Sequence, residues 1–137
     1  MDRPAPRISE SLLLGALGAM LSLFVFYPGF MSTDSVSQLL QARDGELTSI
    51  QPPLMSIIWH YVDLLMRGQT GMLILQNVLY WSGLALILTP FRARQWLYFS
   101  LLFIIGFFPP YFLIQGVLWK DNLMSGFLLL GLSLIHI

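Results

Sequence analysis

The sequence predicts an all-α, polytopic membrane protein with about four spanning helices and one or two interfacial helices. Of its 137 residues, 56% are hydrophobic and only 10% are charged, and the mean hydropathy is +0.73. Soluble domains carry about 25% charged residues, so this chain could not cover a water-facing surface. Its apolar residues also gather in runs that approach the ~20 residues needed to cross a bilayer core.

The charge balance and the absence of cysteine exclude several classes of protein. Seven basic and seven acidic residues give a net charge of zero, whereas binding of nucleic acid needs a basic excess. No cysteine is present, so disulfides and thiolate metal sites are excluded. With only two histidines, a dense metal-binding cluster is not expected.

The first span is predicted over 11–30. This apolar run is longer than the 7–15 residues of a typical signal-peptide core, so we expect it to remain uncleaved. Gly15 and Gly18 favour close contact with another helix, and the Pro28-Gly29 pair favours an end to the helix.

The stretch 31–71 is expected to be an outer loop that contains two amphipathic helices. The first, over 35–42, rests on the helical spacing of Val36, Leu39 and Leu40. Side chains suited to capping a helix precede it at Ser32-Thr33-Asp34.

The second amphipathic helix, over 53–67, is too short to span. Ser56, His60, Asp63 and Arg67 follow one another at spacings that place all four on one helical stripe. Such a helix is expected to lie in the plane of the membrane interface, with its polar stripe wet and Asp63 paired with Arg67. The opposite stripe is apolar and comprises Leu54, Ile57, Ile58, Tyr61 and Leu65.

Three further spans are predicted, over 72–90, 95–114 and 123–137. Gln76 and Asn77 lie inside the first of them, where amides usually form hydrogen bonds between helices. The last run is apolar up to the final residue, so we expect an incomplete span and a chain that is one piece of a longer protein. No functional weight is placed on residues 131–137.

The distribution of basic residues does not orient the chain, because inner and outer counts are four and three whether or not 53–67 spans. Segment length and the polar stripe favour the in-plane helix, with the N-terminus cytoplasmic and the protein in the cell membrane. This topology places Asp34, Gln51, Lys120 and Asp121 on the outer face.

Asp34 is the leading candidate for catalysis. A carboxylate just beyond the first span can act as a general base on a hydroxyl or an amine, and it could help to hold a divalent metal. The alternative is that Asp34 only caps the following helix.

The candidates for substrate binding are Lys120, Asp121, Gln51 and His60. Lys120 could bind a phosphate group; alternatively, Lys120 and Asp121 form an interfacial ion pair or an anchor. Gln51 precedes two prolines that fix the start of the in-plane helix. His60 lies on the polar stripe, where a headgroup-facing role is favoured over catalysis.

The order of these features resembles the N-terminal part of GT-C glycosyltransferases, which include protein O-mannosyltransferases and aminoarabinose transferases. The resemblance lies in Tyr27-Pro28-Gly29, Asp34-Ser35, Gln51-Pro52-Pro53-Leu54, the turn 68–71 and Leu118-Trp119-Lys120-Asp121. It implies transfer of a sugar from a polyprenyl-phosphate donor on the outer face of the membrane. Asp34 would be the base, and Lys120 would bind the lipid phosphate.

Two other functions remain open. A small transporter subunit would need ionisable residues facing a cavity at the middle of the membrane, and the best spans contain none. In a non-catalytic membrane scaffold, Asp34 would be a helix cap and nothing more.

Overall fold

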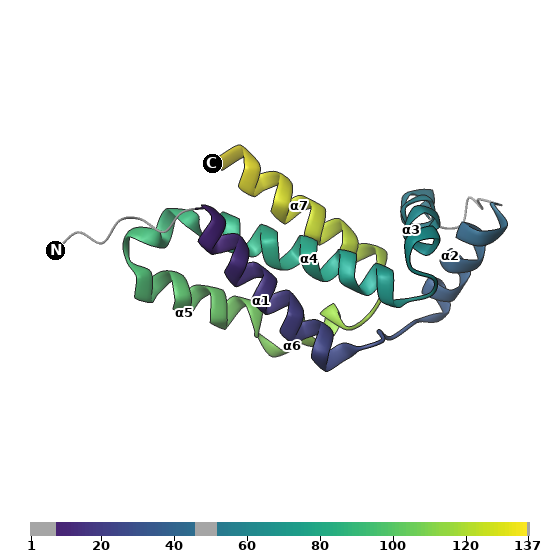
Figure 1. Ribbon diagram of the computed structural model, residues 1–137, viewed down its shortest axis with the longest axis horizontal. Helices are drawn as coiled ribbons and strands as arrows, with labels where there is room; N and C mark the ends of the chain where they lie inside the picture. Colours follow the sequence, from purple (N-terminus) through teal and green to yellow (C-terminus); the bar gives the residue numbers. More distant parts are fainter. Residues whose placement is uncertain (1–7, 46–51, 137) are drawn as a thin grey trace.

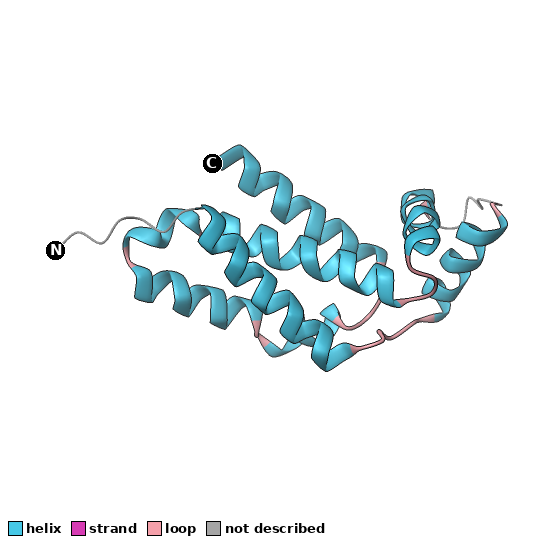
Figure 2. Ribbon diagram, viewed as in Figure 1, coloured by secondary structure: helices cyan, strands magenta, loops and turns pink. Residues whose placement is uncertain are grey.

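The computed structural model describes residues 8–45 and 52–136, and all regular structure within these ranges is helical (Figures 1 and 2). Most of the helices and their connections form a bundle, and a hairpin of two helices lies at one end of it (Figure 1). The elements are α1 (Ile8–Phe26), α2 (Thr33–Asp44), α3 (Pro53–Leu65), α4 (Thr70–Ile87), the 3-10 helix η1 (Thr89–Ala93), α5 (Gln95–Gly106), α6 (Pro109–Gln115) and α7 (Lys120–His136).

Helix α4 is the centre of the bundle and packs against both α1 and α7. Glycines permit this close approach. A Cβ atom added at Gly18 would lie 2.3 Å from the ring of Trp81, and one added at Gly83 would lie 2.7 Å from the backbone nitrogen of Leu130. The close helix contact predicted for Gly15 and Gly18 is therefore confirmed, and α4 is the partner of both.

Two of the described helices are long and apolar enough to cross a membrane, over Ser9–Phe26 and Thr70–Ile87. The predicted span over 95–114 is a bent pair of helices, α5 and α6, whose axes differ by 63°; together they are apolar enough to form one broken span or a re-entrant loop. The described part of the predicted span over 123–137 lies in α7, which has 17 residues with Lys120 and Asp121 in its first turn. Four spanning helices are therefore not confirmed.

The bend between α5 and α6 follows from the two prolines that begin α6. A proline disfavours helical geometry in the residue before it, and Phe108 has an extended ψ of 119°. Proline is well accommodated in the first turn of the next helix, where a backbone N–H has no partner in any case. The chain therefore stops one helix at Gly106 and starts another at Pro109.

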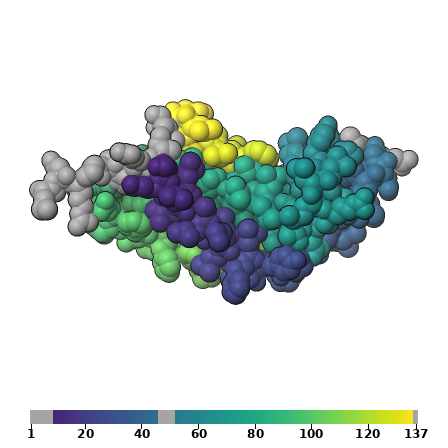
Figure 3. All heavy atoms as spheres, in the orientation of Figure 1, coloured from purple at the N-terminus to yellow at the C-terminus, as the bar shows by residue number. Residues whose placement is uncertain are grey.

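Large apolar side chains cover much of the outer surface of the bundle. On α1 they include Leu17, Met20 and Phe24, of which Phe24 is 85% exposed. The space-filling view shows α1 lying across one face of the elongated molecule (Figure 3). An apolar surface of this extent is costly in water and is expected for helices surrounded by lipid.

Helices α2 and α3 form a hairpin with polar contacts between its two helices. The hydroxyl of Ser56 donates to Oε1 of Gln41 at 3.4 Å, and Nδ1 of His60 is hydrogen-bonded to the carbonyl oxygen of Ala42 at 2.7 Å. The prediction that the polar stripe of α3 is wet is confirmed only in part: His60 and Arg67 are exposed, whereas Ser56 is buried and Asp63 is partly covered. The pattern of α3 alone could not reveal which of these side chains α2 would contact.

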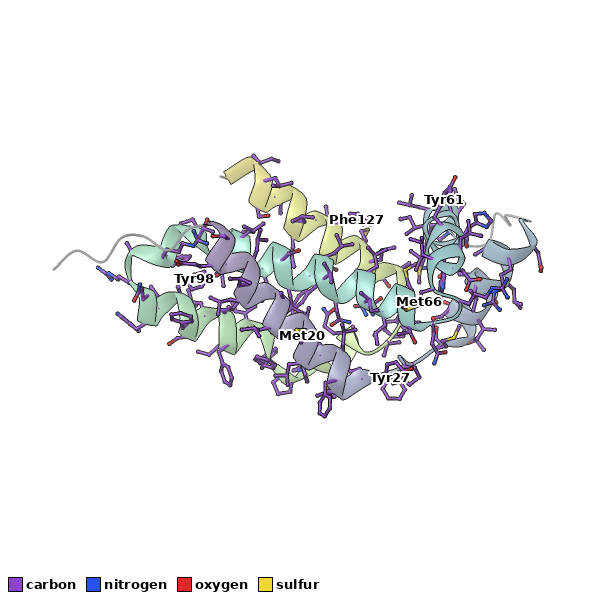
Figure 4. All side chains as sticks on the ribbon, viewed as in Figure 1. Met20, Tyr27, Tyr61, Met66, Tyr98 and Phe127 are labelled. Carbon is purple, nitrogen blue, oxygen red and sulfur yellow. The ribbon has the colours of Figure 1, made fainter. Side chains whose placement is uncertain are left out.

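Much of the apolar stripe of α3 also faces outward. Leu54, Tyr61 and Leu65 are all well exposed, and Tyr61 projects away from the bundle (Figure 4). On α2, Val36 and Leu40 are exposed in the same way, while Ser35, Gln38 and Ala42 are buried. Exposed apolar side chains on both helices suit a helix pair that contacts lipid.

An ion pair joins the two helices of the hairpin. Nε and Nη2 of Arg43 donate to the two carboxylate oxygens of Asp63, each at 3.0 Å. The predicted pairing of Asp63 with Arg67 is therefore wrong. Hydrogen bonds from Arg43, and then from the backbone N–H of Gly68, lower the pKa of the Asp63 carboxyl below its usual value.

Candidate functional site

Two loops that are distant in sequence are joined at the end of the bundle. The N–H of Phe30 donates to the carbonyl of Gly116 at 2.8 Å, and the N–H of Leu118 donates to the carbonyl of Phe30 at 2.9 Å. These bonds form a short parallel bridge between the loop after α1 and the loop before α7. Gly29, at φ +106°, supplies the left-handed conformation that the approach to this bridge requires.

Side chains strengthen the same junction. Ser35 lies in the first turn of α2, is fully buried and donates its hydroxyl proton to the carbonyl of Leu118. Trp119 donates from Nε1 to the hydroxyl oxygen of Ser32 at 3.0 Å. The beginning of α2 is therefore fixed to the beginning of α7.

Buried amides hold the loop before α7 from the other side. Gln76 donates from Nε2 to the carbonyls of Gln115 and Val117, at 3.0 and 2.9 Å. Asn77 also donates to Gln115, at 3.2 Å, and Asn122 donates to Val117, at 2.8 Å. The predicted role of Gln76 and Asn77 in hydrogen bonding between helices is confirmed. They satisfy carbonyl groups that the break between α6 and α7 exposes.

A polar pocket of about 380 Å³ lies at this junction. It brings together Asp34, Lys120 and Asp121, which are far apart in the sequence and which the predicted topology places on one face. We call it the polar pocket. Its lining comprises Ser32, Thr33, Asp34, Gln38, Trp119, Lys120 and Asp121.

Two helices begin at the polar pocket, α2 at Thr33 and α7 at Lys120. Each helix N-terminus carries roughly half a positive charge, which favours negatively charged groups nearby. Asp34 and Asp121 occupy the first turns of these helices. The pocket therefore presents two carboxylates as hydrogen-bond acceptors, with the ammonium group of Lys120 as a donor.

The side-chain cap of α2 is not Asp34. Ser32 is the N-cap residue, and its hydroxyl accepts from the backbone N–H of Ser35 at 3.2 Å. The hydroxyl of Ser35 accepts from the N–H of Ser32 in return, at 3.3 Å, which completes a capping box. The alternative in which Asp34 caps the helix is therefore wrong, and its carboxylate has no hydrogen bond or ion pair with a described residue.

Gln38 is a pocket residue that the sequence analysis missed. It lies one helical turn after Asp34 on the same face of α2 and is only 2% exposed. Its Nε2 atom has no hydrogen-bond acceptor among the described residues. The spacing of four residues from Asp34 was the available signal, but a glutamine in a polar helix is expected to be solvated, and the sequence does not reveal that Gln38 is buried.

An apolar groove of about 480 Å³ adjoins the polar pocket between α3 and α7. Lys120 and Asp121 line both, so the polar pocket and the apolar groove share a boundary. Phe127 lies on the groove side of α7 (Figure 4). The other lining residues are Pro52, Leu54, Met55, Ile58, Leu123, Met124 and Leu128.

The two remaining predicted site residues are not brought to the polar pocket. Gln51 lies outside the described residues. His60 is used within the α2–α3 hairpin, where its Nδ1 atom is bonded to the carbonyl of Ala42. Across 8–45 and 52–136, no group of three or more His, Asp or Glu side chains is arranged to hold a metal ion.

The fold and the site define an all-helical protein in which two helices can span a membrane and a polar pocket lies at one end of the bundle. No protein-family model, no curated protein and no solved structure matches the chain.

Proposed function

We propose that the protein is part of a membrane glycosyltransferase that uses a polyprenyl-phosphate sugar at the outer face of the membrane. The observation that carries this proposal is the shared boundary of the polar pocket and the apolar groove at Lys120 and Asp121. A lipid-linked sugar has a polar head, a phosphate and an apolar chain in the same order. The resemblance to GT-C enzymes in sequence supports the same function.

The chemistry assigns a role to each of two side chains. Asp34 accepts the proton of an acceptor hydroxyl, whose oxygen then forms a bond to the anomeric carbon of the sugar. The bond between that carbon and the phosphate oxygen breaks, and the polyprenyl phosphate leaves with the bonding electrons. The ammonium group of Lys120 stabilises the negative charge on this leaving group.

The position of the site agrees with this proposal. The α2–α3 hairpin exposes apolar side chains such as Leu40 and Leu54 and lies at one end of the bundle (Figure 1). Asp34 and Gln38 of the same hairpin line the polar pocket. A hairpin at the membrane interface would place the pocket at headgroup level, where a lipid phosphate resides. The groove between α3 and α7 would then receive the chain from the lipid side.

The test is transfer of labelled sugar from a polyprenyl-phosphate donor in membranes that contain the protein. Asp34→Asn should lower the transfer rate about 10²–10⁴-fold, the usual contribution of a general base. Asp44→Asn is the matched control, because Asp44 is exposed at the other end of α2 and outside the pocket. Equal transfer by wild type and Asp34→Asn would contradict the assignment of Asp34 as the base.

A further inference from the structure

The burial of Gln38 raises the free energy of the folded protein. A buried amide donor without an acceptor loses its hydrogen bonds to water and gains none in return. Most buried polar groups in native proteins have a partner, and an exception calls for a reason. Nε2 of Gln38 is such an exception, on a residue that is 2% exposed and lines the polar pocket.

Polar side chains near Gln38 on α2 are bonded to other partners among the described residues. Ser32 and Ser35 are occupied with each other, with Trp119 and with Leu118. Gln41, one turn away from Gln38 on α2, accepts a hydrogen bond from Ser56 within the hairpin. The space next to Gln38 is the polar pocket, which a ligand can enter to supply an acceptor for Nε2.

We propose that Gln38 is a ligand-binding residue of the polar pocket, and that its carboxamide donates a hydrogen bond to an oxygen atom of the bound molecule. This inference rests on the proposed function for the identity of the ligand. Asp34 and Asp121 can only accept hydrogen bonds when charged, and Lys120 can only donate. Gln38 adds a neutral, planar donor, and its burial fixes the direction of the N–H bond. A donor with a fixed direction can distinguish a ligand with an oxygen atom at the right position from one without it.

Replacement of Gln38 by methionine tests the proposal, because the two side chains have similar length and shape. An unpartnered donor contributes nothing favourable to folding, so Gln38→Met should leave the melting temperature of the ligand-free protein unchanged or raised. The same variant should bind the ligand about tenfold more weakly, the effect of losing one hydrogen bond to a charged or strongly polar oxygen.

The measurement is thermal unfolding of the 137-residue protein in lipid nanodiscs, followed by tryptophan fluorescence. The probes are undecaprenyl phosphate and its mannosyl and glucosyl derivatives, each titrated to give an affinity. Weakened binding of all three to Gln38→Met would assign Nε2 to a phosphate oxygen. Weakened binding of the glycosylated probes alone would assign it to a sugar oxygen.

Gln41→Met is the matched control: Gln41 lies on the same helix as Gln38, but its amide oxygen accepts a hydrogen bond from Ser56 of α3. It should lower the melting temperature and leave the probe affinities unchanged. A lowered melting temperature for Gln38→Met, or unchanged affinity in that variant, would overturn the proposal for Gln38. If no probe bound to the wild type, the proposed function would be contradicted, and so would the identity of the ligand proposed for Gln38.

Discussion

The hydroxyl of Ser35 donates a hydrogen bond to the carbonyl oxygen of Leu118, which lies 83 positions further along the chain. This contact fixes the first turn of α2 to the residue two positions before α7. The polar pocket exists because of it, since Asp34 is next to Ser35 in the chain and Lys120 follows Leu118 by two residues.

We expect Ser35→Ala to destabilise the protein by about 1–3 kcal/mol, because the buried carbonyl of Leu118 loses its donor and the capping box of α2 is broken. Ser37→Ala is the control: its hydroxyl is on an exposed part of the same helix and donates only to the carbonyl of Thr33. Chemical unfolding in detergent micelles measures both. An equal effect of the two substitutions would contradict the role given to Ser35.

Glycine substitutions test the packing of α4 against α7. A Cβ at Gly83 would lie 2.7 Å from a backbone atom of α7, so Gly83→Ala must separate the helices and should cost about 1–3 kcal/mol. Gly131 lies on α7 with no atom within 4 Å of its added Cβ, and Gly131→Ala should stabilise by up to about 1 kcal/mol. Melting temperatures of the two variants should therefore move in opposite directions.

The ion pair between Arg43 and Asp63 should make the α2–α3 hairpin sensitive to acid. The pKa of Asp63 is lowered in the folded protein, so its contribution to stability is complete above the unfolded value, about 3.9. That contribution is lost as the pH falls through the lower folded value.

Comparison with Asp63→Asn measures this contribution. Wild type should be the more stable of the two at neutral pH, with the difference shrinking in acid. Because the Arg43 side chain is 45% exposed, the difference should be small and should decrease with added salt. A difference that grows on acidification would contradict the assignment.

Cysteine labelling can test the predicted topology, since the chain contains no native cysteine. Arg67→Cys, just after α3, should react with a membrane-impermeant maleimide from outside the cell. Arg94→Cys, between η1 and α5, should react only after the inner face is opened. Arg94 is preferred to Arg92, which is buried. Reaction of Arg67→Cys from the cytoplasm alone would reverse the topology and move the polar pocket to the inner face.

The sequence predicted most helices to within a few residues, because long apolar runs and proline or glycine boundaries act locally. The helix predicted over 53–67 is α3, and the helix predicted over 35–42 is the centre of α2. Local patterns failed where the outcome depends on contact with a second helix. Neither the burial of Ser56 nor the pairing of Asp63 with Arg43 can be read from the sequence of α3 alone.

Some residues of the candidate site could also be predicted from local sequence patterns, and others could not. Asp34, Lys120 and Asp121 were suggested by their positions at the ends of apolar runs, and topology alone was enough to expect them on one face. Gln38 could not be suggested in this way. Its significance depends on its burial and on its unpartnered Nε2 atom, and neither can be read from the sequence of α2.

The bond between Ser35 and Leu118 also sets an order of events during synthesis. At the usual rate of translation, the 83 positions between them correspond to roughly ten seconds. For most of that interval α1 and α2 are already made, while the hydroxyl of Ser35 has not yet met the carbonyl of Leu118. The walls of the polar pocket are therefore complete only after the first turn of α7 has been synthesised.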